Sequence, residues 1–221
     1  LELWRQVKDI SFTEALTEAR EYLGVNKGNS LKQAFPKPKP KIEIKAPSLR
    51  IFADKEDCQD AIVYLQADRE IPLNIIEQYD LRYENGNIAF MYWSDSHREE
   101  IDMIKFLGVE RKDGKKIIFT SKDAKKTLFG KHTIDDDCNT IVITEGELDA
   151  LSFASSGVPA VSVPFGAKWE NERGSDPNME WIQNDYEFLE RFTTIAISMD
   201  MDDAGRRATA SILKRLGAAR C

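Results

Sequence analysis

Two short acidic clusters, each directly after an apolar run, constrain the fold of this chain more than any other feature. The first follows the run 140–143 and covers residues 144–150, and the second follows 194–198 and covers 200–206. Both patterns are typical of a buried strand that ends in polar residues and continues into a helix. Open α/β sheets place their ligand sites at the carboxyl ends of strands, so the two clusters are expected to build one site at a sheet edge.

The carboxylates of the two clusters favour a site for a divalent metal ion. Mg²⁺ prefers oxygen ligands, keeps several waters and is usually bound by one or two carboxylates together with substrate phosphates. Asp200 and Asp202 are expected to point the same way, because side chains alternate along a strand. Arg206 then opens a helix whose N-terminus favours anions. The alternative for either cluster alone is that its acids cap the following helix; two clusters in this order favour the metal site.

The residues in and around the clusters resemble the signature of the TOPRIM domain, which is shared by bacterial-type primases, topoisomerases and some nucleases. That signature appears here as Glu145-Gly146-Glu147-x-Asp149 followed by Asp200-x-Asp202-x-x-Gly205. Flanking residues narrow the resemblance to the primase half of phage and Twinkle-type primase-helicases; they are Leu128-Phe129-Gly130-Lys131 and Val161-Ser162-Val163-Pro164-x-Gly166-Ala167. The resemblance covers roughly residues 60 to 217 and is most specific in its TOPRIM part.

The resemblance implies a DNA primase that acts in DNA replication. Such an enzyme makes short RNA primers on a single-stranded DNA template, by attack of a 3′-hydroxyl on the α-phosphate of an incoming NTP, with Mg²⁺ or Mn²⁺ as cofactor. It implies catalytic and metal-binding roles for Glu145, Asp200 and Asp202, of which Glu145 is also a candidate general base or acid. Supporting acidic roles fall to Glu147 and Asp149. The residues expected to bind the nucleotide or nucleic acid are Lys105, Lys116, Lys131 and Arg206.

Four parts are expected along the chain, with an overall fold class of α/β plus α+β. They are a helix resembling the end of a zinc-binding domain (residues 1–25), a Pro/Lys-rich linker (26–48), an α+β primase subdomain (49–137) and a TOPRIM domain with a mainly parallel sheet flanked by helices (138–221). The chain begins with Leu1 rather than Met, so we expect it to be a fragment. Zinc would then belong only to a missing N-terminal domain, and the TOPRIM domain would be truncated at its C-terminal end.

Hydrophobic periodicity predicts the elements within these parts. Helices are expected at 2–23, 57–66, 73–78, 147–155, 180–190 and 204–216. Strands are expected at 81–83, 88–93, 102–107, 116–120, 140–144, 159–163 and 193–199. Asn85-Gly86 predicts a hairpin turn, and the alternation of strands and helices after residue 140 predicts a parallel sheet. Phe90, Tyr92 and Trp93 are expected in the core rather than on a base-stacking surface.

The distribution of charge suits a surface that handles phosphates. The chain carries a net charge of −7, yet residues 103–132 contain nine Lys or Arg and three acids, a local balance of +6. A basic stretch near an acidic metal site suits nucleotide and nucleic-acid binding; the alternative is a merely solvated face. The sequence has no apolar stretch long enough to cross a membrane, so no membrane partner is expected. Cys58, Cys138 and Cys221 have no metal-binding spacing.

Two other functions stay open at this point. A metal-dependent nuclease of the same superfamily would use the same acids for hydrolysis, and a non-catalytic nucleic-acid-binding module would need none of them. The motif G-x-x-x-x-G-K-[ST] of an NTP-driven motor does not occur in the sequence, so a replicative helicase is expected elsewhere in the parent chain. The fragment itself is expected to be monomeric, in the cytoplasm of a bacterial or phage-infected cell or in an organellar matrix.

Overall fold

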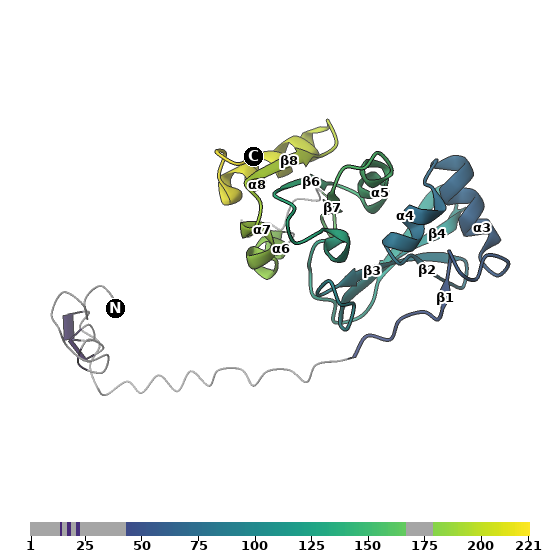
Figure 1. Ribbon diagram of the computed structural model, residues 1–221, viewed down its shortest axis with the longest axis horizontal. Helices are drawn as coiled ribbons and strands as arrows, with labels where there is room; N and C mark the ends of the chain where they lie inside the picture. The colour runs from purple at the N-terminus through teal and green to yellow at the C-terminus, as the bar shows by residue number, and fades with distance from the viewer. Residues whose placement is uncertain (1–13, 15–16, 19–20, 23–42, 167–178) are drawn as a thin grey trace. The chain divides into compact units, whose positions relative to one another are not determined.

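The computed structural model describes residues 14, 17–18, 21–22, 43–166 and 179–221. The chain divides into two compact units, Leu1–Lys41 and Ile42–Cys221. The described residues of the first unit are helical, within the range where a helix is expected. The rest of that expected helix, most of the expected linker and residues 167–178 lie outside the described residues. The second unit contains both sheets of the molecule's described part (Figure 1).

The first half of the second unit is built on an antiparallel sheet with the strand order β1-β2-β3-β4-β5. The strands are β1 (Leu49–Arg50), β2 (Arg82–Glu84), β3 (Asn87–Trp93), β4 (Ile101–Lys112) and β5 (Lys115–Thr120). The predicted hairpin is confirmed, because Asn85 and Gly86 have φ of 49° and 78° and join the paired strands β2 and β3. β4 runs past its predicted end to Lys112, because Asp113-Gly114 forms a second turn at positive φ.

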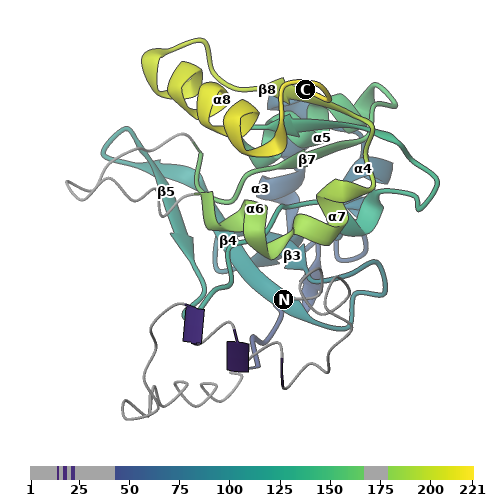
Figure 2. The same cartoon turned by 90° about the vertical axis from the view of Figure 1, so that its left-hand side faces the viewer.

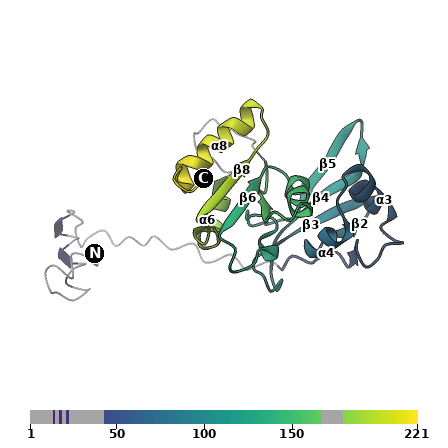
Figure 3. The same ribbon diagram turned by 45° about the horizontal axis from the view of Figure 1, so that its top comes forward.

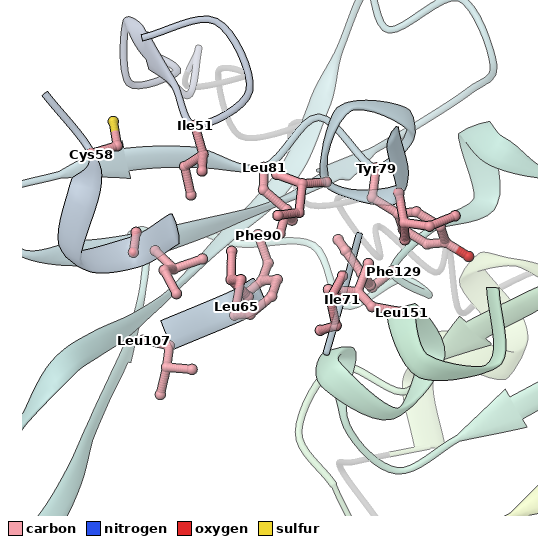
Figure 4. Packing of buried hydrophobic residues seen from close by; sticks show 14 of the residues in the cluster. Ile51, Cys58, Leu65, Ile71, Tyr79, Leu81, Phe90, Leu107, Phe129 and Leu151 are labelled. Atoms are coloured by element: carbon pink, nitrogen blue, oxygen red, sulfur yellow. The ribbon is translucent and has the colours of Figure 1, made fainter. Parts of the chain in front are cut away.

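Helices cover one face of the antiparallel sheet. They are α3 (Gln59–Ile62), which continues as the π-helix η1 (Val63–Asp68), and α4 (Leu73–Gln78). The predicted helix at 57–66 is therefore α-helical only in part. Leu65 from η1 and Phe90 from β3 meet in the core beneath these helices (Figure 4). Phe129 and Leu151 come from the second half of the unit and join the same core, so this cluster spans both halves.

The second half is built on a parallel sheet with the order β7-β6-β8, which confirms the predicted parallel arrangement. Its strands are β6 (Thr140–Thr144), β7 (Ala160–Ser162) and β8 (Thr194–Ser198). The helices are the 3-10 helix η2 (Lys131–Thr133), α5 (Glu147–Ser155), α6 (Glu180–Asn184), α7 (Tyr186–Glu190) and α8 (Asp203–Leu216). Figures 2 and 3 show α8 beside β8, and Ile212 of α8 packs in one cluster with Ile195 of β8. None of the described helices has the length and apolar character needed to cross a membrane.

The helix predicted at 180–190 is corrected by the structure to two short helices, α6 and α7, that meet at Asp185. Asp185 has φ of −111° and ψ of 22°, outside helical geometry. Its carboxylate turns inward and accepts hydrogen bonds from the Leu128 amide and the Lys131 ammonium. The interruption between α6 and α7 therefore coincides with tertiary contacts of Asp185, which the hydrophobic periodicity of the sequence does not encode.

Burial of His132 makes the stability of the fold sensitive to acid. Its ring lies 6.2 Å from that of Tyr79, and burial, with the charges of Arg98 and Lys131, lowers the pKa of His132 to about 3. The unfolded chain binds a proton at this imidazole near its ordinary pKa of about 6.5, whereas the native state keeps it neutral. Stability from this group is thus present above about pH 6.5 and falls by about 1.4 kcal/mol per pH unit below it.

Urea unfolding at about pH 7 and about pH 5 measures this effect. Relative to wild type, His132→Phe is expected to lose less stability between the two pH values, because the carboxyl groups titrate alike in both proteins. His97→Phe alters the exposed histidine and serves as the matched control. If the wild type and His132→Phe lose the same stability on acidification, the buried neutral state of His132 is wrong.

Candidate active site

The two acidic clusters meet at the carboxyl edge of the parallel sheet. β6 and β8 are neighbours in register, and their last paired residues are Thr144 and Ser198. The amide of Glu145 donates a hydrogen bond to the carbonyl of Ser198 over 3.2 Å, so the pairing continues into the first cluster. The predicted convergence of the two clusters is confirmed, and it follows from parallel pairing, which brings both strand ends to the same edge.

Glu145 is held between the second cluster and the loop after β7. Its Oε2 atom accepts a hydrogen bond from the backbone N–H of Asp200 at 3.0 Å. On its other side, a Cβ placed on Gly166 would lie 3.3 Å from Glu145 Oε1, and Gly166 has a φ of +61°. A side chain at position 166 would therefore be strained and would press on the carboxylate. The hydrogen bond from Asp200 orients the Glu145 carboxylate at the sheet edge, and glycine at position 166 leaves room for it.

Asp202 lies at the start of α8 and acts as its N-cap. Its Oδ1 atom accepts a hydrogen bond from the Gly205 amide at 2.8 Å, and its side chain is exposed. Arg206 does not pair with it in the structure, because the guanidinium donates to the Met201 carbonyl at 2.6 Å and 3.2 Å. The capping role is thus observed for Asp202, while its role as a metal ligand and that of Arg206 as a phosphate ligand stay predictions.

Asp149 shows that negative charge accumulates at this edge. Its Oδ2 accepts a hydrogen bond from the amide of Gly146, the N-cap of α5, at 3.2 Å, which is the half of a capping box that a glycine N-cap allows. Desolvation raises the pKa of Asp149, the carboxylates of Asp200 and Glu147 raise it further, and the Gly146 amide and the Lys116 ammonium oppose them. Asp149 and Asp200 line one pocket of about 350 Å³. A cation bound here would relieve the repulsion between these acids.

Glu147, by contrast, is buried and paired with two side chains of the antiparallel sheet. Its Oε1 atom lies 2.7 Å from the Lys105 ammonium and accepts a hydrogen bond from the Tyr92 hydroxyl. Lys105 also donates to the Pro164 carbonyl at 3.2 Å. Lys105 was predicted from the sequence to bind nucleotide or nucleic acid, and in the structure it is bound to an acid of the first cluster. Tyr92 lies in the core, as expected, and no sequence signal indicated its contact with Glu147.

Lys131 and Lys116 occupy different surroundings. Lys131 is buried, and its ammonium lies 2.5 Å from Asp185 and 3.7 Å from Asp102, both also buried. Burial raises the pKa of Asp185, and the Lys131 ammonium opposes that rise. This pair lines a second pocket of about 730 Å³ that includes no residue of the two acidic clusters. Lys116 is exposed on β5, and its charge lowers the pKa of Asp149, so it acts on the acidic site electrostatically.

The donor chemistry at the sheet edge fits Mg²⁺ or Mn²⁺. Within the described part of the chain, no three His, Cys, Asp or Glu side chains form a preassembled metal-binding group. Mg²⁺ needs fewer than three protein side chains, because one or two carboxylates, several waters and substrate phosphates complete its coordination shell. Glu145 and Asp200 come from adjacent strand ends and supply that number. Asp202 lies two residues after Asp200 in the same cluster, and its second carboxylate oxygen adds a further metal-binding atom.

A parallel sheet with acids at two neighbouring strand ends is the arrangement that the resemblance to a TOPRIM domain implies, and comparison with known proteins agrees. The family described as Toprim-like matches residues 142–221. Among curated relatives, the Twinkle homolog protein of Arabidopsis thaliana, chloroplastic/mitochondrial, is 29% identical over 61% of this chain and 19% of its own length. The DNA helicase/primase of Enterobacteria phage T3 is 29% identical over 70% of this chain and 23% of its own length.

The structure leads to the same group of proteins. The primase fragment of the bacteriophage T7 primase-helicase protein is similar at a TM-score of 0.53 and 25% identity, over 70% of this chain and 61% of that one. Residues 142–221 therefore resemble a Toprim-like domain, and the predicted resemblance to the primase half of phage and Twinkle-type primase-helicases is confirmed. The chain spans about a fifth of the length of the two curated relatives.

Proposed function

We propose that this chain is the RNA-polymerising part of a DNA primase, which makes short RNA primers on single-stranded DNA by metal-dependent nucleotidyl transfer. The observation that carries the proposal is the junction of Glu145 with Asp200, at the edge where β6 and β8 end. The relatives named above support primase chemistry in particular, because they include a helicase/primase and a primase fragment. The family match and the fold alone are also compatible with hydrolysis.

The roles follow from the charges at the site. Glu145 and Asp200, with Asp202, would hold Mg²⁺ or Mn²⁺, which lowers the pKa of an attacking hydroxyl and neutralises charge on phosphate oxygens. The hydrogen bond from the Asp200 amide orients the Glu145 carboxylate, so the site needs little rearrangement when substrate arrives. The N-terminus of α8 adds partial positive charge next to Asp202. Lys116 supplies an exposed ammonium for the phosphates of the NTP or the template.

The proposed partners are a single-stranded DNA template, NTPs, the growing RNA primer and a replicative helicase. Residues 103–132 carry a local balance of +6, and although Lys105 and Lys131 are paired internally, exposed cations of this stretch such as Lys116 favour binding of a phosphate backbone. The helicase belongs to the proposal because the phage T3 relative is a DNA helicase/primase, of which this chain covers 23%. For Lys131, the proposal is indirect: within its ion pair with Asp185 it holds α7 against the segment that precedes β6.

The proposal is tested with the full-length protein, single-stranded DNA, labelled NTPs, and Mg²⁺ or Mn²⁺. Short labelled RNA products that disappear when EDTA is added are the expected result. Metal-dependent shortening of the DNA, without RNA synthesis, would replace the primase by a nuclease that uses the same acids. Binding of DNA with neither reaction would leave the non-catalytic binding module.

A further inference from the structure

Glu147 is the point where the antiparallel sheet contacts the acidic site. It lies in the first turn of α5 and is the buried acid of the first cluster, with a side chain 8% exposed. The two groups that bind it, Tyr92 and Lys105, lie on the neighbouring strands β3 and β4. Both groups reach the same oxygen, Oε1, so the carboxylate has a single defined orientation.

Lys105 extends this connection to the loop that contacts Glu145. Its ammonium bridges Glu147 Oε1 at 2.7 Å and the Pro164 carbonyl at 3.2 Å. Gly166, two residues after Pro164, lies beside the Glu145 carboxylate, because a Cβ added at position 166 would be 3.3 Å from Glu145 Oε1. The residue pair on β3 and β4 therefore contacts Glu147 in the first turn of α5, and Lys105 also contacts the Pro164 carbonyl in the loop after β7.

We propose that Tyr92 and Lys105 are positioning residues of the acidic site, which act through Glu147 and the Pro164 carbonyl to set the orientation of Glu145. Tyr92 cannot itself meet a substrate, because its side chain is fully buried. Lys105 compensates the buried negative charge of Glu147, whose burial without a partner would be strongly destabilising. This inference rests on the proposed function, because it concerns the same site. Only its kinetic test requires the proposed activity, whereas its metal-binding test does not.

Tyr92→Phe is the first test, because it removes one hydroxyl and leaves the ring in the core. The matched control is Tyr79→Phe, since Tyr79 is equally buried and its hydroxyl donates to the Ala160 carbonyl at 2.8 Å, away from the acids. Loss of a group that orients a metal ligand typically costs about 10-fold to 100-fold in metal affinity or activity. Tyr92→Phe is therefore expected to weaken Mn²⁺ binding by about 10-fold, whereas Tyr79→Phe leaves it unchanged.

Mn²⁺ binding is measured by electron paramagnetic resonance of the metal with the full-length protein, without DNA or NTP. That measurement keeps its meaning if the protein proves to be a nuclease, so failure of the proposed function and failure of this inference are distinguishable. Thermal unfolding of both variants reports any general loss of stability. The inference is overturned if Tyr92→Phe and Tyr79→Phe bind Mn²⁺ equally well, or if Mn²⁺ affinity falls only in proportion to stability.

A double-mutant cycle separates positioning by Lys105 from direct phosphate contact. If Lys105 acts through Glu147, then Lys105→Met lowers kcat for the chain's reaction, and adding it to Glu147→Gln lowers kcat little further. The KM for NTP is expected to stay within about 2-fold in both backgrounds. Losses that multiply in the double variant, with a raised KM for NTP, would instead show that Lys105 contacts the nucleotide and would overturn its assignment as a positioning residue.

Discussion

Replacing Glu145 with Gln is expected to reduce metal-dependent primer synthesis by at least about 100-fold while the protein stays folded. The amide is nearly isosteric with the carboxylate and can still accept the hydrogen bond from the Asp200 amide. What it loses is the negative charge, at the point where the two strand ends meet. Asp200→Asn should have an effect of similar size, because it removes the second charge of the same edge.

The measurement is the yield of labelled RNA from the full-length protein on single-stranded DNA, alongside thermal unfolding of each variant. Asp136→Asn is the control, since Asp136 is an exposed acid that pairs with Arg191 at 3.4 Å, outside both clusters. Its activity should match wild type. If Glu145→Gln keeps more than about half of the wild-type activity, the negative charge of Glu145 is not needed for the reaction. Because neither substitution touches the core, the unfolding temperatures should stay close to that of wild type.

Gly205→Ala is expected to destabilise the protein and to disrupt the second acidic cluster. A Cβ at this position would lie 2.0 Å from the backbone oxygen of Asp200, a distance that no packing adjustment of a side chain can relieve. In an ordinary helix the same change stabilises by about 1 kcal/mol. Here the clash is expected to reverse the sign and to cost about 2 kcal/mol net, because the Asp200 backbone must move.

The unfolding temperature of Gly205→Ala should therefore be about 4–8 °C lower than that of wild type for a chain of this size. Primer synthesis should also fall, because Asp200 is displaced. Arg207→Ala, at an exposed position of the same helix, is the matched control and is expected to leave both quantities unchanged. A rise in the unfolding temperature of Gly205→Ala would show that helix propensity dominates. The prediction that a Cβ at position 205 clashes with the Asp200 backbone would then be wrong.

The sequence by itself determined the order and type of most elements and the meeting of the two clusters. Strand β6 at 140–144 and helix α5 at 147–155 agree with their predicted bounds, and β8 lies within its predicted range. These elements are encoded locally, by runs of apolar residues and by helical periodicity. Convergence of Glu145 and Asp200 followed from a rule of topology, because parallel strands bring their carboxyl ends to one edge.

Only the tertiary structure decided what the buried charges bind. Lys105, predicted to bind nucleotide or nucleic acid, is paired with Glu147, and Lys131, with the same prediction, is paired with Asp185, a residue 54 positions away in sequence. No periodicity encodes such pairs, since they depend on which strands and helices pack together. A buried charge requires a partner close in space, and here that requirement broke a helix at Asp185 and joined the antiparallel sheet to the acidic site.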